Sequence, residues 1–383
     1  KINFMYFNLN QTQLSIIDSV QNIMKNFDDD YWLQCDKENK FPHKFYAEIA
    51  SGGWLGICMP MKFGGTALGV SDASIFMQKV SETGGGMAAA SSIHINIFGP
   101  HPIVVYGNNK QKEKWLPPLI SGKEKTCFGV TEPDAGLDTG KLKTFAKKIN
   151  DGYLVNGQKI WTSTAKIADK ILLLARTIPV EECKKNTDGL TLFYTELDRK
   201  KIEVKEISKM GRAAVDSNQI FIDNLEVPDF DRIGEEGKGF KYILDSLNPE
   251  RILIAAEALG IGKNALSRAV KYASDRIVFD RPIGKNQSIQ HPLAENWIEL
   301  EAAELLIAKA AHQYDNGQNA GGMANAAKFF AAEAGFKAAT QAVITLGGMG
   351  YAKEYHVERL LRESLIPKLA PVSAQMILNY ISE

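Results

Sequence analysis

The sequence is poor in cysteine and histidine. Its 383 residues contain four cysteines (Cys35, Cys58, Cys127 and Cys183), none in a CxxC pair, and six isolated histidines. This scarcity argues against a disulfide framework and against a metal site. It is typical of a reducing compartment, so we expect a cytoplasmic protein, or a mitochondrial matrix protein if the chain is a processed eukaryotic one.

Charge of one sign and long apolar runs are also lacking. Lysine plus arginine equals aspartate plus glutamate at 45 each, which provides no basic surface for a nucleic acid. No apolar stretch approaches the roughly 20 residues of a membrane-spanning helix. Walker A, GxSxG and HExxH motifs are missing, as is a Rossmann glycine fingerprint behind a strand. We therefore expect neither a nucleic acid nor a membrane as a partner.

Three segments differ in their pattern of apolar residues. Residues 1–124 show apolar positions at helical spacing, as in QTQLSIIDSVQNIMKNF. Residues 125–235 contain short strand-like runs, such as KILLLART and GLTLFYTEL, with turn residues between them. Residues 236–383 return to long, alanine-rich helical patterns that end in glycine. We predict an α+β protein with an N-terminal helical domain, a middle antiparallel β-barrel or sandwich domain, and a C-terminal four-helix-bundle domain.

Two local patterns make sharper predictions. In GYLVNGQKIWTS, the pair Asn156-Gly157 predicts a two-residue hairpin turn between short strands. In LNPERILIAAE, Asn248 is a candidate N-cap and Pro249 suits the first helical position. Glu250 would then lie in the first turn of a helix, where the macrodipole stabilises an acid.

Four sequence blocks carry a family resemblance together. They are VTEPDAGLDT from Val130, IWTST from Ile160, DRIVFDRPIGKNQSIQHPLAE from Asp275 and GGMGYAKEYHVERLLRE from Gly347. Alone, GGMGY indicates only a helix end followed by a turn. In order and spacing the four blocks resemble the acyl-CoA dehydrogenase family over nearly the whole chain.

The resemblance implies noncovalent FAD between the β domain and the C-terminal bundle. By position, Phe128, Val130 and Thr131 would contact the flavin through backbone and hydroxyl groups. Trp161 and Ser163 would lie against the isoalloxazine ring, with Ser163 near N5. Such groups satisfy a flavin without adding charge. Without the other blocks, Trp161 would be an ordinary strand aromatic and Ser163 a turn residue.

The resemblance also implies that a neighbouring subunit completes the cofactor site. Arg276, Phe279 and Gln287 match those positions, and Gly347 with Gly348 matches the close approach to the pyrophosphate. A homo-oligomer, a dimer of dimers, is therefore expected. The alternative for Arg276 is a solvated cation at a helix end.

Several positions depart from the family pattern, although Ser373 and Gln375 still match positions that contact FAD. Ile344 stands where a glutamine is usual, and Asp280 where a glycine is usual. Leu137 replaces a serine that often contacts the thioester tail.

The catalytic base of most relatives is a glutamate in a segment that aligns here with LAPVSAQM. Pro371 occupies its position, and proline also lacks the backbone N–H that would hold the thioester carbonyl. Val372 could supply that donor after a local shift. Isovaleryl- and long-chain-type relatives instead place the base directly before an arginine, as in Glu250-Arg251. Glu250 is thus the expected base, and Glu257, two turns later, is the reserve candidate.

The implied reaction is α,β-dehydrogenation of an acyl-CoA thioester to the trans-2-enoyl-CoA. Leu137, Asn248 and Arg251 are the positions expected to face the substrate. An electron-transferring flavoprotein would take the electrons from reduced FAD. Two alternatives stay open: a flavin oxidase or monooxygenase on the same fold, and a non-catalytic protein that binds acyl-CoA or FAD.

Overall fold

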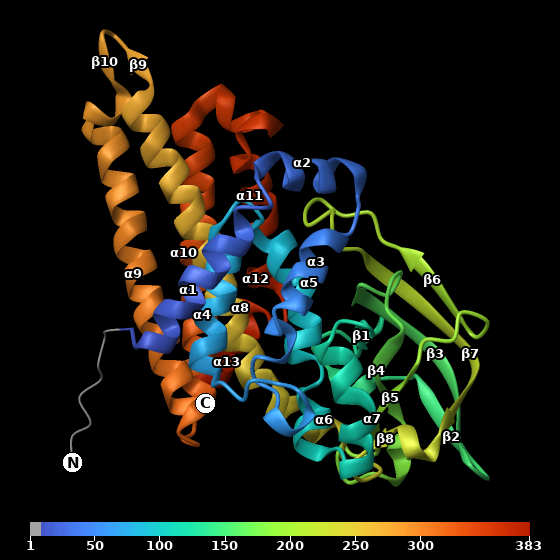
Figure 1. Ribbon diagram of the computed structural model, residues 1–383. Coiled ribbons are helices and arrows are strands. Elements are labelled where there is room, and N and C mark those ends of the chain that lie inside the picture. Colours follow the sequence, from blue (N-terminus) through green and yellow to red (C-terminus); the bar gives the residue numbers. More distant parts are fainter. Residues whose placement is uncertain (1–8) are drawn as a thin grey trace. The chain divides into compact units, whose positions relative to one another are not determined.

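The computed structural model describes residues 9–383, in which helices are followed by strands and then by helices again (Figure 1). This order confirms the predicted α+β class. The helices are α1 (Gln11–Met24), α2 (Asp29–Glu38), α3 (His43–Ser51), α4 (Val70–Glu82), α5 (Gly86–Phe98), α6 (His101–Tyr106), α7 (Asn109–Ile120), α8 (Gly239–Asp275), α9 (Gln287–Asp315), α10 (Gly321–Leu346), α11 (Val357–Ser364), α12 (Ile366–Leu369) and α13 (Ala374–Ser382).

The strands are β1 (Thr126–Gly129), β2 (Phe145–Ile149), β3 (Gly152–Ser163), β4 (Lys170–Arg176), β5 (Leu190–Glu196), β6 (Ile202–Glu206), β7 (Ser217–Pro228), β8 (Arg232–Ile233), β9 (Ile277–Val278) and β10 (Arg281–Pro282). The chain forms two compact units from separate stretches. The helical unit combines residues 9–33 with Leu68–Ala90 and Arg251–Glu383. The mixed unit combines Gln34–Ala67 with Ser91–Glu250.

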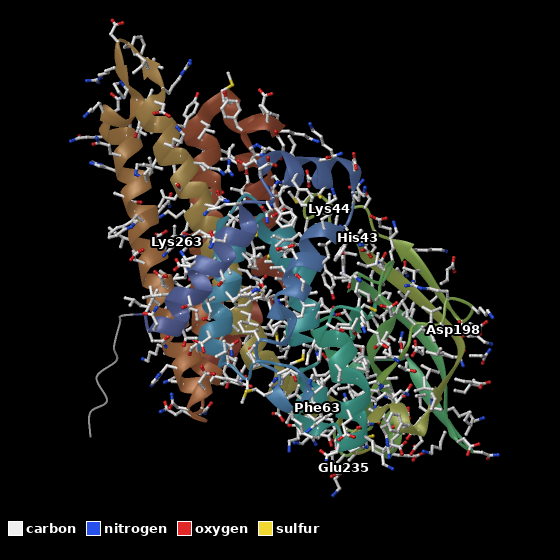
Figure 2. All side chains as sticks on the ribbon, in the orientation of Figure 1. His43, Lys44, Phe63, Asp198, Glu235 and Lys263 are labelled. Carbon is white, nitrogen blue, oxygen red and sulfur yellow. The ribbon has the colours of Figure 1, made fainter. Side chains whose placement is uncertain are left out.

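Alanine-rich helix faces allow close packing in the helical unit. α9 and α10 lie side by side, and α10 also packs against α11, α12 and α13 (Figure 1). At Gly335 of α10, an added Cβ would lie 2.5 Å from the carbonyl oxygen of Ala258 in α8, so this crossing requires glycine. Lys263 of α8, labelled in Figure 2, pairs with Glu304 of α9 at 2.7 Å. Within residues 9–383, no helix combines the length and apolarity needed to cross a bilayer.

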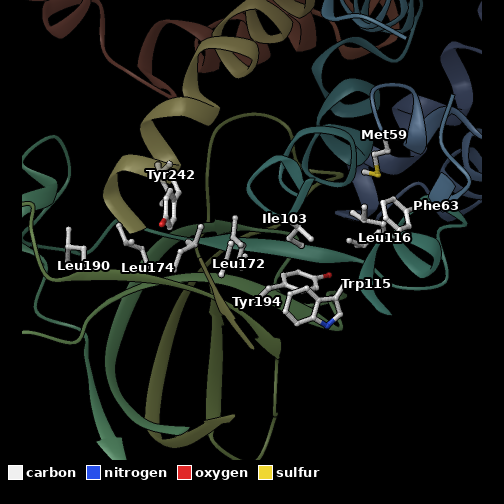
Figure 3. Close-up of a cluster of buried hydrophobic side chains, with 14 of the residues drawn as sticks. Met59, Phe63, Ile103, Trp115, Leu116, Leu172, Leu174, Leu190, Tyr194 and Tyr242 are labelled. Carbon is white, nitrogen blue, oxygen red and sulfur yellow. The ribbon is translucent and has the colours of Figure 1, made fainter. Parts of the chain in front are cut away.

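The mixed unit is built on one sheet in the order β6-β7-β3-β2-β4-β5-β8. Its pairings are antiparallel except that β1, and one residue of β2, pair with β4 in parallel. Ile171 and Leu173 of β4 belong to one hydrophobic cluster, while Leu172 and Leu174 belong to a second one that includes Trp115 of α7 (Figure 3). β4 is therefore buried on both faces, which explains why KILLLART is apolar without alternation.

The predicted hairpin turn at Asn156-Gly157 is wrong. β3 runs unbroken through both residues, and its register against β7 shifts between Val155 and Gly157, as at a β-bulge. The hairpin turn lies at residues 150–151, between β2 and β3. Gly157 has φ of 151°, and a Cβ there would lie 2.5 Å from the Thr144 hydroxyl oxygen. The glycine thus allows β3 to approach the neighbouring backbone closely. An Asn-Gly pair alone cannot show whether its glycine serves a turn or such a close approach.

The predicted helix start at Asn248 and Pro249 is also wrong. α8 begins at Gly239, so both residues lie inside it. Pro249 has no N–H, so the carbonyl of Asp245, one turn earlier, loses its usual helical partner. Tyr242 and Ile243 belong to the cluster of Figure 3, and Phe240 and Leu247 pack against it. This packing extends the helix through the proline. Tertiary packing has overridden a local signal that usually marks a helix start.

Candidate functional site

The end of β3 presents an aromatic side chain outward. The register of β3 against β7 shifts between Lys159 and Thr162, and Trp161 within this shift has φ of 62°. A left-handed backbone at a bulky residue is uncommon, and such strain gathers at functional sites. The indole of Trp161 is 56% exposed as a result. A large flat apolar face is therefore available for a planar ligand.

Ser163, two residues on, is half-buried and is held by an arginine that the sequence patterns did not single out. The Arg212 guanidinium donates to the hydroxyl oxygens of Ser163 at 3.0 Å and Ser217 at 2.9 Å. It also donates to Ser91 at 3.3 Å. Ser163 and Ser217 face each other across β3 and β7. Arg212 lies 49 residues from Ser163 in a loop, so no local signal could have linked the two.

The segment after β1 runs along β3. Phe128 pairs with Leu172 of β4 and packs on the hydrophobic cluster of Figure 3. The carbonyl oxygen of Thr131 accepts from the N–H of Ile160 at 2.9 Å. The carbonyl oxygen of Val130 accepts from the Lys159 ammonium at 3.0 Å. The carbonyls that fix this segment are thus engaged, and within residues 9–383 the Thr131 hydroxyl bonds to no other protein group.

A buried ion pair lies beneath the same segment. The ammonium of Lys159, which is completely buried, lies 2.8 Å from the Glu132 carboxylate. Glu132 also accepts from the backbone N–H groups of Lys143 at 2.6 Å and Thr144 at 3.0 Å. Burial alone would raise the pKa of Glu132, but the charge of Lys159 and these hydrogen bonds hold that pKa below its ordinary value. Burial lowers the pKa of Lys159 to about 8, although Glu132 opposes the shift.

This shift predicts a stability change at alkaline pH. Between the folded-state pKa of about 8 and the unfolded value of 10.5, the unfolded chain binds more protons at Lys159 than the folded one. The contribution of Lys159 to the free energy of unfolding therefore rises with pH in this window and is constant below it. Between pH 8 and pH 10.5, we expect the free energy of unfolding of wild type to rise by up to about 3 kcal/mol relative to that of Lys159→Met. Urea unfolding of both proteins at several pH values measures this, and a flat difference would contradict it.

Leu137 lies in the loop after this segment and is exposed, and its side chain has no hydrogen-bonding group. Just before it, a β-bridge between Glu132 and Ala135 closes a short turn. The structure thus leaves Leu137 accessible to a ligand.

Glu250 is a half-buried residue in the interior of α8, which has no acidic residue in its first turn. The helix macrodipole acts within the first turn, so it no longer accounts for this acid. Asn248 and Arg251 are half-buried on either side of it. Glu257, two turns later, is completely buried, and its backbone carbonyl accepts from the Ser81 hydroxyl at 3.0 Å. Of the two acids, Glu250 is the less buried residue.

In the helical unit, β9 and β10 form a hairpin that carries two of the predicted residues. Phe279 is 94% exposed at its tip, and Phe279 and Asp280 have φ of 51° and 60°. Two consecutive left-handed residues make a turn that favours glycine and that aspartate tolerates, which explains the departure at Asp280. Arg276, just before β9, and Gln287, at the start of α9, are both exposed.

The glycines of GGMGY follow the last turn of α10 and form a short 3₁₀ helix. Gly347 has φ of 60°, and a Cβ at Gly347 or Gly348 would meet no other atom within 4 Å. Space beside both backbones is therefore open to a ligand. Ile344, in the last turn of α10, is exposed rather than packed.

The C-terminal segment places Ser373 at the N-cap of α13, where its hydroxyl accepts from the N–H of Met376 at 3.4 Å. Gln375 is exposed in the first turn. The Val372 carbonyl accepts from the ammonium of Lys328, a buried residue of α10, at 2.5 Å. Within residues 9–383, the Val372 N–H donates to no other protein group. Lys328 thus fixes the residue whose amide follows Pro371.

Each unit, taken by itself, offers groups that fit a flavin dinucleotide. The mixed unit presents an exposed indole, a held hydroxyl and a fixed carbonyl-bearing segment. The helical unit presents an exposed cation at Arg276 and open backbone at Gly347 and Gly348. Aromatic faces and hydroxyls suit the isoalloxazine, and a guanidinium with open glycine backbone suits a pyrophosphate.

Comparisons with known proteins show what the sequence and the fold are similar to. The sequence matches the family models for the N-terminal, middle and C-terminal domains of acyl-CoA dehydrogenases at residues 10–123, 127–225 and 237–375. An acyl-CoA dehydrogenase of Bacillus subtilis is 37% identical over 335 residues, which cover 87% of each chain. The caffeyl-CoA reductase-Etf complex subunit CarC of Acetobacterium woodii is 33% identical over 331 residues, 86% of each chain. Butyryl-CoA dehydrogenase from Megasphaera elsdenii superposes with a TM-score of 0.94 at 30% identity and 99% coverage of both chains.

Proposed function

This chain belongs to the acyl-CoA dehydrogenase family of oxidoreductases, and from that premise we propose that it oxidises an acyl-CoA thioester to the trans-2-enoyl-CoA with FAD. The observation that carries the proposal is the end of β3. There a strained backbone turns the Trp161 indole outward, and Arg212 holds the Ser163 hydroxyl two residues away. Folding of a strand end requires neither feature, whereas an exposed indole and a fixed hydroxyl both suit a flavin ring.

Glu250 acts as the base that removes the α-proton of the thioester. Its place inside α8, beside Pro249 and away from the helix start, removes the electrostatic explanation for an acid there. The Glu250 carboxylate gains the proton and becomes neutral, while the C–H electron pair forms the new double bond. Bound FAD supplies the acceptor for the hydride that leaves the β-carbon. Leu137, Asn248 and Arg251 border the acyl chain and thioester in this proposal.

The thioester carbonyl needs a hydrogen-bond donor, because its oxygen gains negative charge as the α-proton leaves. Pro371 cannot donate. The Val372 N–H takes this role in our proposal, since it has no other protein acceptor within residues 9–383 and Lys328 holds the Val372 carbonyl. The shift by one residue explains how a proline can stand at the family's usual glutamate.

FAD would be held by residues of two subunits. In this proposal, one subunit contacts the cofactor through Phe128, Val130, Thr131, Trp161, Ser163, Ser373 and Gln375. Arg276, Phe279, Gln287, Gly347 and Gly348 serve the cofactor of a neighbour in a dimer of dimers. The exposure of Phe279, at 94%, supports this, because an aromatic at a hairpin tip is seldom left in water without a partner.

An electron-transferring flavoprotein is the proposed electron partner, and the name of the Acetobacterium woodii relative includes such a complex. That relative is a reductase, which favours the reverse reaction as a second candidate function. Glu250 would then return a proton to the α-carbon of an enoyl-CoA, since the same residues serve both directions of one equilibrium.

An anaerobic titration of the FAD-loaded protein tests the proposal. We expect one class among short, branched, long and aryl-substituted acyl-CoAs to bleach the visible absorption of oxidised flavin within one turnover. Rapid oxygen consumption by the reduced protein would favour an oxidase instead. Bound FAD that no acyl-CoA bleaches, and reduced FAD that no enoyl-CoA reoxidises, would reject dehydrogenation in both directions.

A further inference from the structure

Arg212 gathers three serine hydroxyls from three separate elements of the mixed unit. Ser91 comes from α5, Ser163 from the end of β3 and Ser217 from the start of β7. Both Nη atoms of the guanidinium take part, at 2.9–3.3 Å. The planar, rigid fork of arginine carries five N–H donors in fixed directions, which suits several fixed acceptors.

The direction of these hydrogen bonds limits what the Ser163 hydroxyl can do. A guanidinium only donates, so the Ser163 oxygen accepts from it. The Ser163 hydrogen must then point away from the guanidinium, towards another group. Because the donor is charged, the bond is stronger than a neutral one and polarises the O–H that it contacts. The outcome is a hydroxyl that is fixed in place and made a better donor.

The backbone around this hydroxyl is strained at three points. Trp161, Thr164 and Arg212 have φ of 62°, 61° and 56°. Each left-handed non-glycine residue costs on the order of 1–3 kcal/mol and persists only where the surroundings enforce it. Strained residues thus lie two positions before Ser163, directly after it, and at the arginine that holds it, which supports a role for the placement of Ser163 beyond folding.

The positive charge of Arg212 acts on its surroundings. The pKa of the nearby Lys209 lies below its ordinary value, first because of burial and next because of the charge of Arg212, although Glu206, Asp216 and Asp36 oppose it. The charge of Arg212 thus acts at this end of the sheet alongside three carboxylates, and a cation there favours a ligand that gains negative charge on reduction.

We infer that Arg212 is a positioning residue that holds the Ser163 hydroxyl and a positive charge behind the N5 edge of the bound flavin, and thereby raises the flavin reduction potential. The inference rests on the proposed function, together with the expectation from the family resemblance that Ser163 lies near N5. A flavin gains negative charge on two-electron reduction, and a fixed cation one hydroxyl away stabilises that state. Arg212 does not touch the reacting atoms in this arrangement and acts through Ser163 and through its field.

The test measures the two-electron midpoint potential of FAD-loaded Arg212→Met, Arg212→Lys and wild type by chemical reduction against reference dyes, with no acyl-CoA present. We expect Arg212→Met to lower the equilibrium constant of two-electron flavin reduction about tenfold, which lowers the midpoint potential by about 30 mV. Arg212→Lys keeps the charge, so we expect its potential to fall by less than half of that amount. Arg199→Met is the matched control, because Arg199 lies in the same unit but donates to the Ala168 carbonyl.

Each outcome decides the matter. An unchanged or higher potential in Arg212→Met overturns the inference, as does an equal drop in Arg199→Met. If Arg212→Met does not fold, Arg212→Lys remains, with Ser217→Ala as a second variant that loosens the guanidinium; wild-type potentials in both overturn the inference. A wild type that binds FAD but is not bleached by acyl-CoA would reject dehydrogenation while leaving this potential shift measurable. A wild type that binds no FAD would reject both.

Discussion

Glu250→Gln is expected to slow flavin reduction by the best acyl-CoA about 10²–10⁴-fold, because a positioned general base contributes that much to a proton transfer. Glutamine keeps the size and polarity of the side chain but cannot accept the α-proton. Binding of FAD and of acyl-CoA should remain, since neither requires the negative charge. Anaerobic stopped-flow measurement of flavin bleaching, with α-deuterated and unlabelled substrate, reads the proton-transfer step directly.

Two matched variants sharpen this experiment. Glu226→Gln changes an exposed acid on β7 of the mixed unit and should react at the wild-type rate. Glu257→Gln removes the buried carboxylate two turns along α8. A greater loss in Glu257→Gln than in Glu250→Gln would move the base to Glu257. Equal rates in Glu250→Gln and wild type would leave Glu250 without a catalytic role.

The segment order and most strands could be predicted from the sequence, because apolar periodicity reports burial and burial dominates these elements. The two local predictions that failed were both based on single dipeptides. Asn156-Gly157 has the chemistry of a turn, but the second strand neighbour β7 binds this stretch of β3 as a continuous strand. Asn248-Pro249 has the chemistry of a helix start, but packed residues before it extend α8. In each case contacts with distant residues outweighed a local preference.

Side-chain partnerships were the part that the sequence did not reveal. Glu132 lies in one of the four sequence blocks that carry the family resemblance, yet its partner Lys159 lies 27 residues later. One signal was available, because Lys159 interrupts the inward positions of β3 and a buried lysine requires a partner. Arg212 offered no such signal, since an arginine in a loop is ordinary. The turn at Asp280 could be anticipated only in part: the family's glycine implies a left-handed residue, and the structure shows one.

We expect loss of Glu132 to destabilise the protein more than loss of its partner Lys159. Glu132→Ala leaves a buried ammonium without its carboxylate and removes the acceptor of the Lys143 and Thr144 N–H groups. We expect it to lower the free energy of unfolding by about 3–5 kcal/mol at pH 7. Lys159→Met should cost less, because the remaining carboxylate keeps both backbone donors and methionine fills the space of the lysine stem.

The double variant tests whether the cost comes from an unpaired charge. When Lys159→Met is added to Glu132→Ala, the stranded ammonium is gone, so the combined loss should be smaller than the sum of the single losses. Lys143→Met is the matched control, since it breaks the exposed pair with Asp134 in the same segment and should change stability too little to measure. Urea unfolding at pH 7 provides all four values. Strictly additive losses would show that the two side chains stabilise the unit independently.

The same variants connect stability to cofactor binding. Lys159 holds the carbonyl of Val130 at 3.0 Å, and Glu132 holds the amides that follow, so the pair fixes the segment proposed to lie along the flavin. We expect Lys159→Met to weaken FAD binding even where the protein stays folded, because the freed segment must be ordered again on binding. Lys143→Met should retain FAD as wild type does. Wild-type FAD affinity in a folded Lys159→Met protein would confine the ion pair to a structural role.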